Sequence, residues 1–198
     1  VAKDALNDIE DKNIFISGAG GSIGSEISRQ ILEHNPKSLI IFDLSEYNLF
    51  QVERECAALK LSKSLQTSII PILGDIRDIN NLSFVFNKYT IHTVYHAAAY
   101  KHVPLVEDQN NVVKACENNI LGTLNLAKTS IEHDVNSFVM ISTDKAVRPS
   151  NIMGASKRMA ETVIQSLDAH QSTTKFSMVR FGNVINSSGS VIPTFIDQ

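Results

Sequence analysis

The chain has 198 residues, 43% of them hydrophobic and 20% charged, and its formal net charge is -3. This length and composition suit one globular domain with a substantial core, and the charge gives no sign of a nucleic-acid-binding surface. The longest apolar runs have the length of strands, so the sequence predicts neither a transmembrane helix nor a signal peptide. The two cysteines, Cys56 and Cys116, lack the spacing of a metal or redox motif, and we expect buried, reduced thiols.

Strand-like and helix-like segments alternate along the chain. We expect a polar arm at residues 1–12 and one domain at residues 13–198. The predicted strands cover residues 13–17, 38–42, 68–73, 93–96, 136–141 and 175–180. The predicted helices cover residues 22–34, 45–61, 77–89, 108–133 and 150–170, with Ser45 capping the second. This alternation predicts an α/β fold with a parallel, doubly wound sheet.

A glycine-rich turn joins the first predicted strand to the first predicted helix. Residues 18–24 read G-A-G-G-S-I-G, with the spacing G-x-x-G-x-x-G. Glycines in this place allow a tight turn and let backbone amides approach a pyrophosphate, to which the helix N-terminus adds partial positive charge. We therefore predict a dinucleotide site at Gly18, Gly21, Ser22, Ile23 and Gly24, with a plain glycine-rich connection as the alternative.

Asp43 closes the second predicted strand. A carboxylate in this position accepts hydrogen bonds from ribose hydroxyls and repels a 2′-phosphate. No Arg or Lys lies within residues 43–53, so the sequence favours NAD(H) over NADP(H) as cofactor. A surface or helix-capping aspartate is the alternative interpretation of Asp43.

Residues at the ends of the following strands extend the predicted cofactor site. Asp75 follows the third strand, where it would contact the adenine edge, although an ordinary turn aspartate would look the same. Small residues after the fourth strand would let the chain pass close to the cofactor. The further cofactor contacts that we assign are Ser45, Asp75, Ile76, Ala97, Ala98, Ala99, Lys101, Asn119 and Lys157.

An acid and a base, Asp144 and Lys145, stand side by side where the fifth predicted strand ends. Open α/β sheets bind their ligands at this edge, although a solvated ion pair is the alternative. Lys157 follows in the pattern Met153-x-x-x-Lys157, and positions i and i+4 share one face of a helix. In a Tyr-x-x-x-Lys site the tyrosine takes the alcohol proton as hydride leaves, which Met153 cannot do. Either another group takes this proton or the redox step is impaired.

Lys101 and His102 follow the fourth predicted strand at the same edge of the sheet. Both side chains are able to bind a phosphate or a sugar hydroxyl, although a structural role fits His102 equally well. The remaining histidines form no cluster with ligand spacing, so we predict no metal site.

Several longer segments carry a family resemblance: G-A-G-G-S-I-G-S-E, F-D-L-S-E-Y-N-L, G-D-I-R-D, H-A-A-A-Y-K-H-V-P-L-V-E, N-I-L-G-T-L-N-L, I-S-T-D-K-A-V-R-P, N-I-M-G-A-S-K-R-M-A-E and R-F-G-N-V-I-N-S-S-G-S-V. With them the chain resembles an extended short-chain dehydrogenase/reductase with a Rossmann-like fold. More narrowly, it resembles the UDP-N-acetylglucosamine 4,6-dehydratases of bacterial surface polysaccharide biosynthesis, which serves capsule and lipopolysaccharide. The resemblance runs from about residue 13 to the end of the chain.

The resemblance implies a reaction on a UDP-sugar. Bound NAD would oxidise C4 of the sugar, Lys145 would remove the C5 proton that the ketone acidifies, and Asp144 would assist loss of the C6 hydroxyl. Hydride would then return to C6 and leave a 4-keto-6-deoxy sugar. Lys157 would hold the nicotinamide ribose, and Thr143 belongs to the implied catalytic set. The implied substrate contacts are Lys101, His102, Arg180 and Asn183.

The chain departs from the family pattern in two ways. Met153 replaces the usual tyrosine, as it does in a branch of long, membrane-anchored members. Family members also continue into a substrate-covering region, so this chain, which begins at Val1 and stops at Gln198, is expected to be a truncated piece of a longer protein. We expect a cytoplasmic homo-oligomer without a membrane segment of its own, from a parent protein at the cytoplasmic face of the inner membrane. An epimerase or plain oxidoreductase on nucleotide sugars, and a catalytically silent NAD-binding module, are the alternatives.

Overall fold

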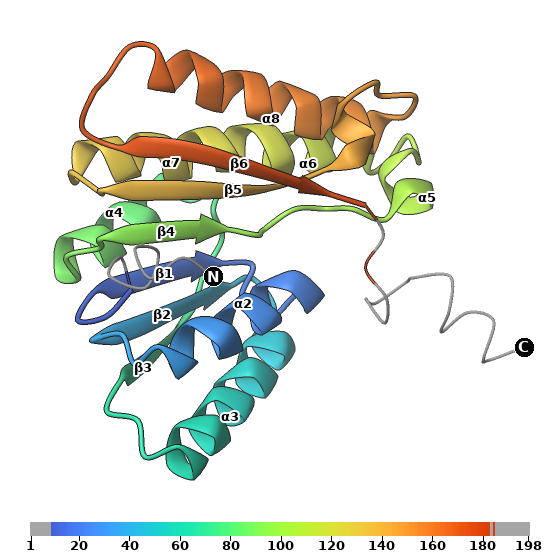
Figure 1. Cartoon of the computed structure of the whole chain (residues 1–198). Coiled ribbons are helices and arrows are strands. Elements are labelled where there is room, and N and C mark those ends of the chain that lie inside the picture. Colours follow the sequence, from blue (N-terminus) through green and yellow to red (C-terminus); the bar gives the residue numbers. More distant parts are fainter. Residues whose placement is uncertain (1–8, 183, 185–198) are drawn as a thin grey trace, which may run out of the picture.

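A six-stranded parallel sheet forms the centre of the computed structural model, which describes residues 9–182 and 184. Most of the expected polar arm, and Asn183, lie outside these residues. The strand order is β3-β2-β1-β4-β5-β6, and every neighbouring pair is parallel. The strands are β1 (Asn13–Ser17), β2 (Ser38–Asp43), β3 (Ser68–Leu73), β4 (Thr93–His96), β5 (Ser137–Thr143) and β6 (Lys175–Phe181). The predicted doubly wound α/β fold is therefore confirmed (Figure 1).

Helices pack on both faces of the sheet (Figure 1). Helices α2 (Ser22–Glu33) and α3 (Glu46–Ser62) share one apolar core with strands β1 and β2. On the other face, α4 (Ile79–Lys88), α7 (Thr123–Glu132) and α8 (Ile152–Asp168) pack over strands β1, β2, β4 and β5. The central strands β1 and β2 are buried along nearly their whole length, because each is covered on both faces.

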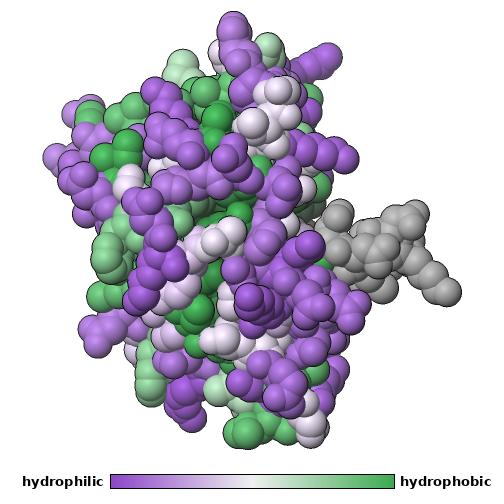
Figure 2. Space-filling model, turned by 90° about the vertical axis from the view of Figure 1, so that its left-hand side faces the viewer, coloured by the Kyte–Doolittle hydropathy of each residue, from purple (hydrophilic) through white to green (hydrophobic). Residues whose placement is uncertain are grey.

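Strand β6, at one edge of the described sheet, is more exposed than the neighbouring strand β5. Its residues alternate between half-buried and exposed, and Val179 is 44% exposed. Strand β5 alternates between buried and half-buried residues, as expected for a strand covered on one face. Figure 2 views the side of the molecule where the strands begin, and there hydrophilic and hydrophobic side chains are interspersed.

The helix predicted for residues 108–133 is wrong in its start and in its regularity. The structure has α6 (Val112–Cys116), a π-helical segment η1 (Glu117–Gly122) and then α7. A widened π turn is common at functional sites. Here Gly122 lies so close to Ile76 that a Cβ on the glycine would be 2.6 Å from Cδ1 of that side chain. Periodicity in the sequence carries no sign of this tertiary contact.

Three smaller elements also differ from the sequence expectation. A short helix α5 (Val103–Val106) follows β4 and was not predicted. Strand β5 does not break before Thr143 but includes it, and a single 3₁₀ turn η2 (Asp144–Ala146) follows. Helix α4 starts two residues later than predicted, because the carboxylate of Asp78 caps it by accepting from two backbone amides. The predicted cap by Ser45 is confirmed, since its hydroxyl accepts from Asn48 N.

The two cysteines have different environments. Cys56 is fully buried, and this burial raises the pKa of its thiol to about 11. Cys116 is only partly buried, so the expectation of a buried thiol is wrong there. Both are free. Within the described part of the chain, no helix is both long and apolar enough to cross a membrane.

Candidate cofactor and catalytic site

A cleft of about 940 Å³ lies at the carboxyl ends of the strands, where the strand order reverses between β1 and β4. Open α/β sheets bind ligands at this point, because neighbouring loops leave the sheet in opposite directions. Its walls come from the turns after β1, β2, β3 and β4, from α5 and α6, and from η1. The residues that line it are Gly18, Gly20, Gly21, Ser22, Phe42, Asp43, Leu44, Ser45, Asn48, Gly74, Asp75, Ile76, Ala97, Ala98, Ala99, Tyr100, Lys101, His102, Leu105, Val106, Asn111, Lys114, Ala115 and Asn118.

The glycine turn after β1 has no room for side chains at three positions. Gly18 has a φ of +67°, and a Cβ there would lie 2.5 Å from Ala98 N. A Cβ on Gly24 would lie 2.0 Å from Gly18 O, and one on Gly20 would meet Asn48 at 2.5 Å. The N-cap residue of α2 is Gly21, which has no side chain that could bond the first amides of the helix. These features fit the diphosphate of a dinucleotide.

Asp43 fastens the glycine turn to the start of α3. One carboxylate oxygen accepts from Gly20 N and the other from Ser45 N, both at 2.8 Å. The side chain lines the cleft beside the glycine turn. A carboxylate whose position two backbone amides fix is suited to accept hydrogen bonds from ribose hydroxyls. The position of the Asp43 carboxylate therefore fits the dinucleotide that the sequence predicts.

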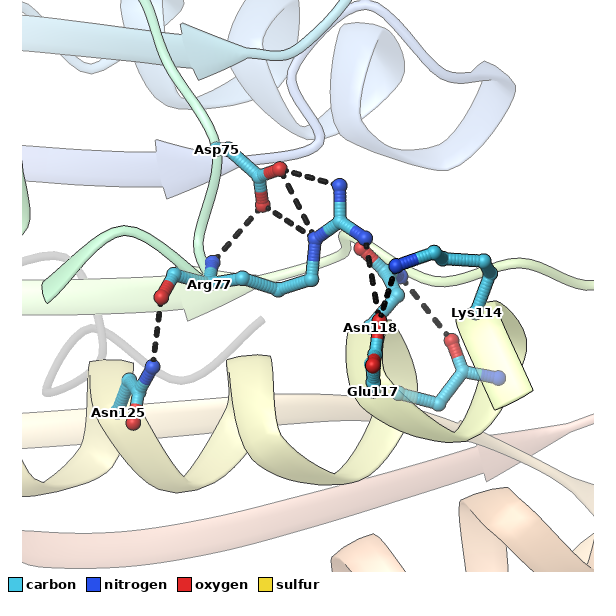
Figure 3. Close-up of polar contacts among 7 residues, drawn as sticks. Asp75, Arg77, Lys114, Glu117, Asn118 and Asn125 are labelled. Carbon is cyan, nitrogen blue, oxygen red and sulfur yellow. Dashed lines mark hydrogen bonds and ion pairs between the residues drawn. The ribbon is translucent and has the colours of Figure 1, made fainter.

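A network of charged residues joins the turn after β3 to α6 and η1 (Figure 3). The guanidinium of Arg77 donates to the Asp75 carboxylate at 2.5 and 2.9 Å, and these hydrogen bonds lower the pKa of Asp75. Arg77 also lies 3.8 Å from Glu117 on η1, which pairs with Lys114 of α6 at 2.8 Å. Arg77 thus joins the turn after β3 to the opposite wall of the cleft. Sequence reasoning missed Arg77, Lys114 and Glu117, because their proximity is tertiary.

The two asparagines of η1 have different surroundings. Asn119 is fully buried; its Oδ1 accepts from Tyr100 N at 2.8 Å, and its Nδ2 donates to Tyr100 O and to Ser156 Oγ, both at 3.0 Å. It therefore holds the loop after β4 against α8, and its assigned contact with the cofactor stays a prediction. Asn118, which sequence reasoning did not select, lines the cleft instead.

The acid–base pair lies on the 3₁₀ turn after β5, the strand next to β4, and outside the residues that line the cleft. Asp144 Oδ1 accepts from Thr143 Oγ1 at 3.0 Å and from Lys145 Nζ at 3.4 Å. The bond from Thr143 and the charge of Lys145 lower the pKa of Asp144. The side chains of Asp144 and Lys145 are 57% and 38% exposed, so both are accessible to a ligand.

Lys157 and Met153 are both buried on the inner face of α8. Lys157 Nζ donates to Ile141 O at 2.9 Å, and burial lowers its pKa to about 8. Met153 packs in an apolar cluster with Val106 of α5 and Ala115 of α6. The position at which a tyrosine would take a proton is therefore filled by apolar contacts.

Glu161, one turn after Lys157, is a buried carboxylate that sequence reasoning missed. It accepts from Ser142 Oγ at 2.6 Å, from Arg180 Nε and Nη2 at 2.8 and 2.7 Å, and from Arg158 Nη1 at 3.1 Å. Burial acts to raise its pKa, but these hydrogen bonds outweigh burial and lower the pKa to about 2. The guanidinium of Arg180 is thus paired with Glu161, and its assigned contact with substrate stays a prediction.

The assigned residues therefore fall into groups. The assigned residues from the turns after β1 to β4, including Lys101 and His102, line one cleft. Ile23 and Gly24, which follow Ser22 in α2, do not line it. Thr143, Asp144 and Lys145 lie together on the next turn, and Lys157 lies beneath it. His96 is a further buried group: its ring nitrogens lie 2.7 Å from Ser17 Oγ and 2.8 Å from Thr123 Oγ1, and burial lowers its pKa to about 3.

Comparison with known proteins identifies the family of the chain. Residues 14–198 match the family described as "Polysaccharide biosynthesis protein". The chain is 48% identical over 193 residues to the capsular polysaccharide biosynthesis protein CapD of Staphylococcus aureus, covering 96% of this chain and 31% of CapD. It is 35% identical over 187 residues to a UDP-N-acetylglucosamine 4,6-dehydratase (inverting) of Campylobacter jejuni, covering 93% and 52% of the two chains.

Two further relatives belong beside these. A UDP-glucose 4-epimerase of Rickettsia rickettsii is 34% identical, with coverage of 95% of this chain and 53% of the epimerase. The X-ray structure of Pen from Bacillus thuringiensis superposes with a TM-score of 0.84 at 38% identity, covering 96% of this chain and 56% of Pen. The chain thus spans about one third to one half of the length of these relatives.

We predict that Gly24→Ala destabilises the fold by about 1–3 kcal/mol, because the new methyl group would overlap Gly18 O and force the turn to shift. Urea unfolding followed by circular dichroism measures the change. Gly21→Ala is the matched control, since its Cβ would lie 3.4 Å from Gly18 O, an ordinary contact. Equal stability losses in the two variants would contradict the steric explanation.

We predict that the stability difference between the wild type and Glu161→Gln depends on pH. Because the pKa of Glu161 is lowered on folding, its contribution is complete above pH 4.5 and disappears as the pH falls towards about 2. Urea unfolding at a series of pH values would measure how the difference in the free energy of unfolding becomes smaller as the pH falls. Glu26→Gln, which changes an exposed pair, is the control with a small effect. A difference that does not change with pH would contradict the assignment.

Proposed function

The chain belongs to the polysaccharide biosynthesis protein family, and from this premise we propose that it is the NAD-binding and catalytic part of a nucleotide-sugar 4,6-dehydratase. Its substrate is UDP-N-acetylglucosamine or a close UDP-N-acetylhexosamine. The observation that carries the proposal is the adjacent pair Asp144 and Lys145 beside the cleft, because loss of water needs an acid and a base. The 35% identity to an inverting 4,6-dehydratase supports the same reaction.

The cleft residues bind and orient the cofactor. The glycine turn and the first amides of α2 hold its diphosphate, Asp43 holds the adenosine ribose, and Asp75 faces the adenine. NAD, when bound, would supply the acceptor of hydride from C4 and later its donor to C6, and the C4 ketone formed in between makes the C5 proton of the sugar acidic. Lys157 would bind the nicotinamide ribose and bring its positive charge to that part of the site.

Asp144 and Lys145 move the protons. We assign to the Asp144 carboxylate the proton of the C4 hydroxyl, which Met153 cannot take. Protonated Asp144 then delivers this proton to the leaving C6 hydroxyl, which departs as water. Lys145, whose Nζ lies 3.4 Å from Asp144 Oδ1, is the base that takes the C5 proton and returns it to C5 after water has left.

A nucleotide-sugar 4-epimerase is the second candidate, because the chain is 34% identical to a UDP-glucose 4-epimerase. The same C4 oxidation would begin both reactions, but an epimerase loses no water. Mass spectrometry of UDP-N-acetylglucosamine incubated with the full-length protein separates them. Loss of one water supports the dehydratase, and an unchanged mass with inverted C4 supports the epimerase.

We predict that NAD(H) binds more tightly than NADP(H), because the Asp43 carboxylate would meet the 2′-phosphate with like charge. Calorimetric titration with both cofactors measures the preference. Asp43→Asn should reduce this preference, because it weakens the binding of NAD(H) and removes the repulsion of the 2′-phosphate of NADP(H). Tighter binding of NADP(H) to the wild type would show that the assignment of Asp43 is wrong.

We predict different defects when the two proton-transfer groups are changed in the full-length protein. Lys145→Ala should still form reduced cofactor but lose deuterium exchange at C5 and lose turnover. Asp144→Asn should slow the appearance of reduced cofactor itself, because the C4 proton has no acceptor. Each loss should be about 10²–10⁴-fold. Rapid-mixing absorbance and mass spectrometry in deuterated water measure the two steps. Full deuterium exchange at C5 and full turnover in Lys145→Ala would show that Asp144 and Lys145 form only a structural ion pair.

A further inference from the structure

Glu161 is a buried carboxylate that no step of the proposed reaction uses. Its side chain is 0% exposed, and four hydrogen bonds from three side chains reach it. Removing a carboxylate from water is costly, and replacing a buried ion pair with apolar residues often leaves stability unchanged or improves it. The presence of Glu161 beneath the acid–base turn is therefore not explained by its contribution to stability.

The partners of Glu161 come from three elements that meet at the site. Ser142 is the residue of β5 directly before Thr143, Asp144 and Lys145, and its hydroxyl donates to Glu161 at 2.6 Å. Arg180 lies at the end of β6 and donates with two nitrogens. Glu161 itself extends from α8, one turn after Lys157. One carboxylate therefore fastens two neighbouring strand ends to the helix behind them.

Both strand ends lead directly to Asp144. Strand β5 continues into the 3₁₀ turn that carries it, and β6 continues to Gly182, at which a Cβ would lie 3.2 Å from Asp144 Oδ2. Because Asp144 and Lys145 are 57% and 38% exposed, burial does not fix their orientation. Their placement therefore depends on the backbone below them, including β6, which is the last strand in the order of the sheet among the described residues.

We propose that Glu161 is a positioning residue for the acid–base turn. It fixes the ends of β5 and β6 against α8, and through Ser142 it sets where Asp144 and Lys145 stand relative to the cleft. Glu161 itself does not touch the substrate. The catalytic consequence rests on the proposed dehydratase function, whereas the fixing of the turn does not.

Ser142→Ala in the full-length protein tests the link to β5, because it removes one donor and leaves both arginine pairs in place. We expect the turnover rate to fall about 10- to 100-fold, since a small misplacement of reacting groups has an effect of this size. The KM for the nucleotide sugar and the Kd for NAD should stay at their wild-type values. Ser142→Thr, which keeps the hydroxyl, should restore much of the rate.

Arg158→Met is the matched control. Arg158 donates to the same carboxylate from within α8, is 44% exposed and holds neither strand. We therefore expect wild-type turnover in this variant. Arg180→Lys tests the link to β6 with little risk to folding, because Arg180 is 38% exposed and lysine keeps the charge but loses the two-nitrogen pairing. Its turnover should fall as in Ser142→Ala.

Amide hydrogen exchange gives a readout that is independent of the reaction. Exchange of residues 143–146 should become faster in Ser142→Ala and Arg180→Lys but not in Arg158→Met. If the wild type releases no water from the sugar, the dehydratase proposal fails, and this exchange pattern still decides the role of Glu161. Wild-type exchange and turnover in Ser142→Ala, or an equal loss in Arg158→Met, would overturn the proposal and leave Glu161 as an ordinary structural ion pair.

Discussion

The close approach between the glycine turn after β1 and the segment after β4 is the constraint on which the rest of the site depends. At Gly18 and Gly24 a single added carbon would lie 2.0 to 2.5 Å from backbone atoms. This contact lets β1 and β4 stand side by side while their loops leave the sheet in opposite directions, which opens the cleft. Asp43 then ties the turn to the next helix through Gly20 N and Ser45 N, so that three strand ends present their backbone and side chains to one ligand.

Beneath this surface the fold keeps three ionisable groups away from water, each in a different way. His96 stays neutral between two hydroxyl groups, because burial lowers its pKa to about 3. Lys157 rests on a carbonyl oxygen with its pKa lowered to about 8. Glu161 keeps its charge because arginine and serine donors surround it. A buried group without such partners would cost several kcal/mol, so each partner set fixes a side chain, and with it a strand end, in one position.

Met153, which stands where the family pattern has a tyrosine, takes part in the packing of the helices. It fills the space between α8 and helices α5 and α6, where Val106 and Ala115 contact it. The proposed reaction therefore places proton transfer on the turn after β5, where Asp144 accepts from Thr143 and Lys145. The side chains of this turn are exposed, and in our proposal the buried carboxylate of Glu161 holds the backbone below them through Ser142.

The sequence by itself determined the parts that depend on local physics: all six strands, the cap at Ser45, the glycine turn and the position of Asp43 at a strand end. Periodicity, turn residues and caps act over a few positions, so one sequence is enough to reveal them. Only the tertiary structure decided that Asn118 lines the cleft while Asn119 bonds Tyr100 and Ser156, and that Glu161 joins two strands. The partners that link Asn119 and Glu161 to other elements lie 19 or more positions away, as with Asn119 and Tyr100 or Glu161 and Ser142. Which residues of a helix or loop meet depends on how the elements pack, and the local pattern of side chains carries no record of it.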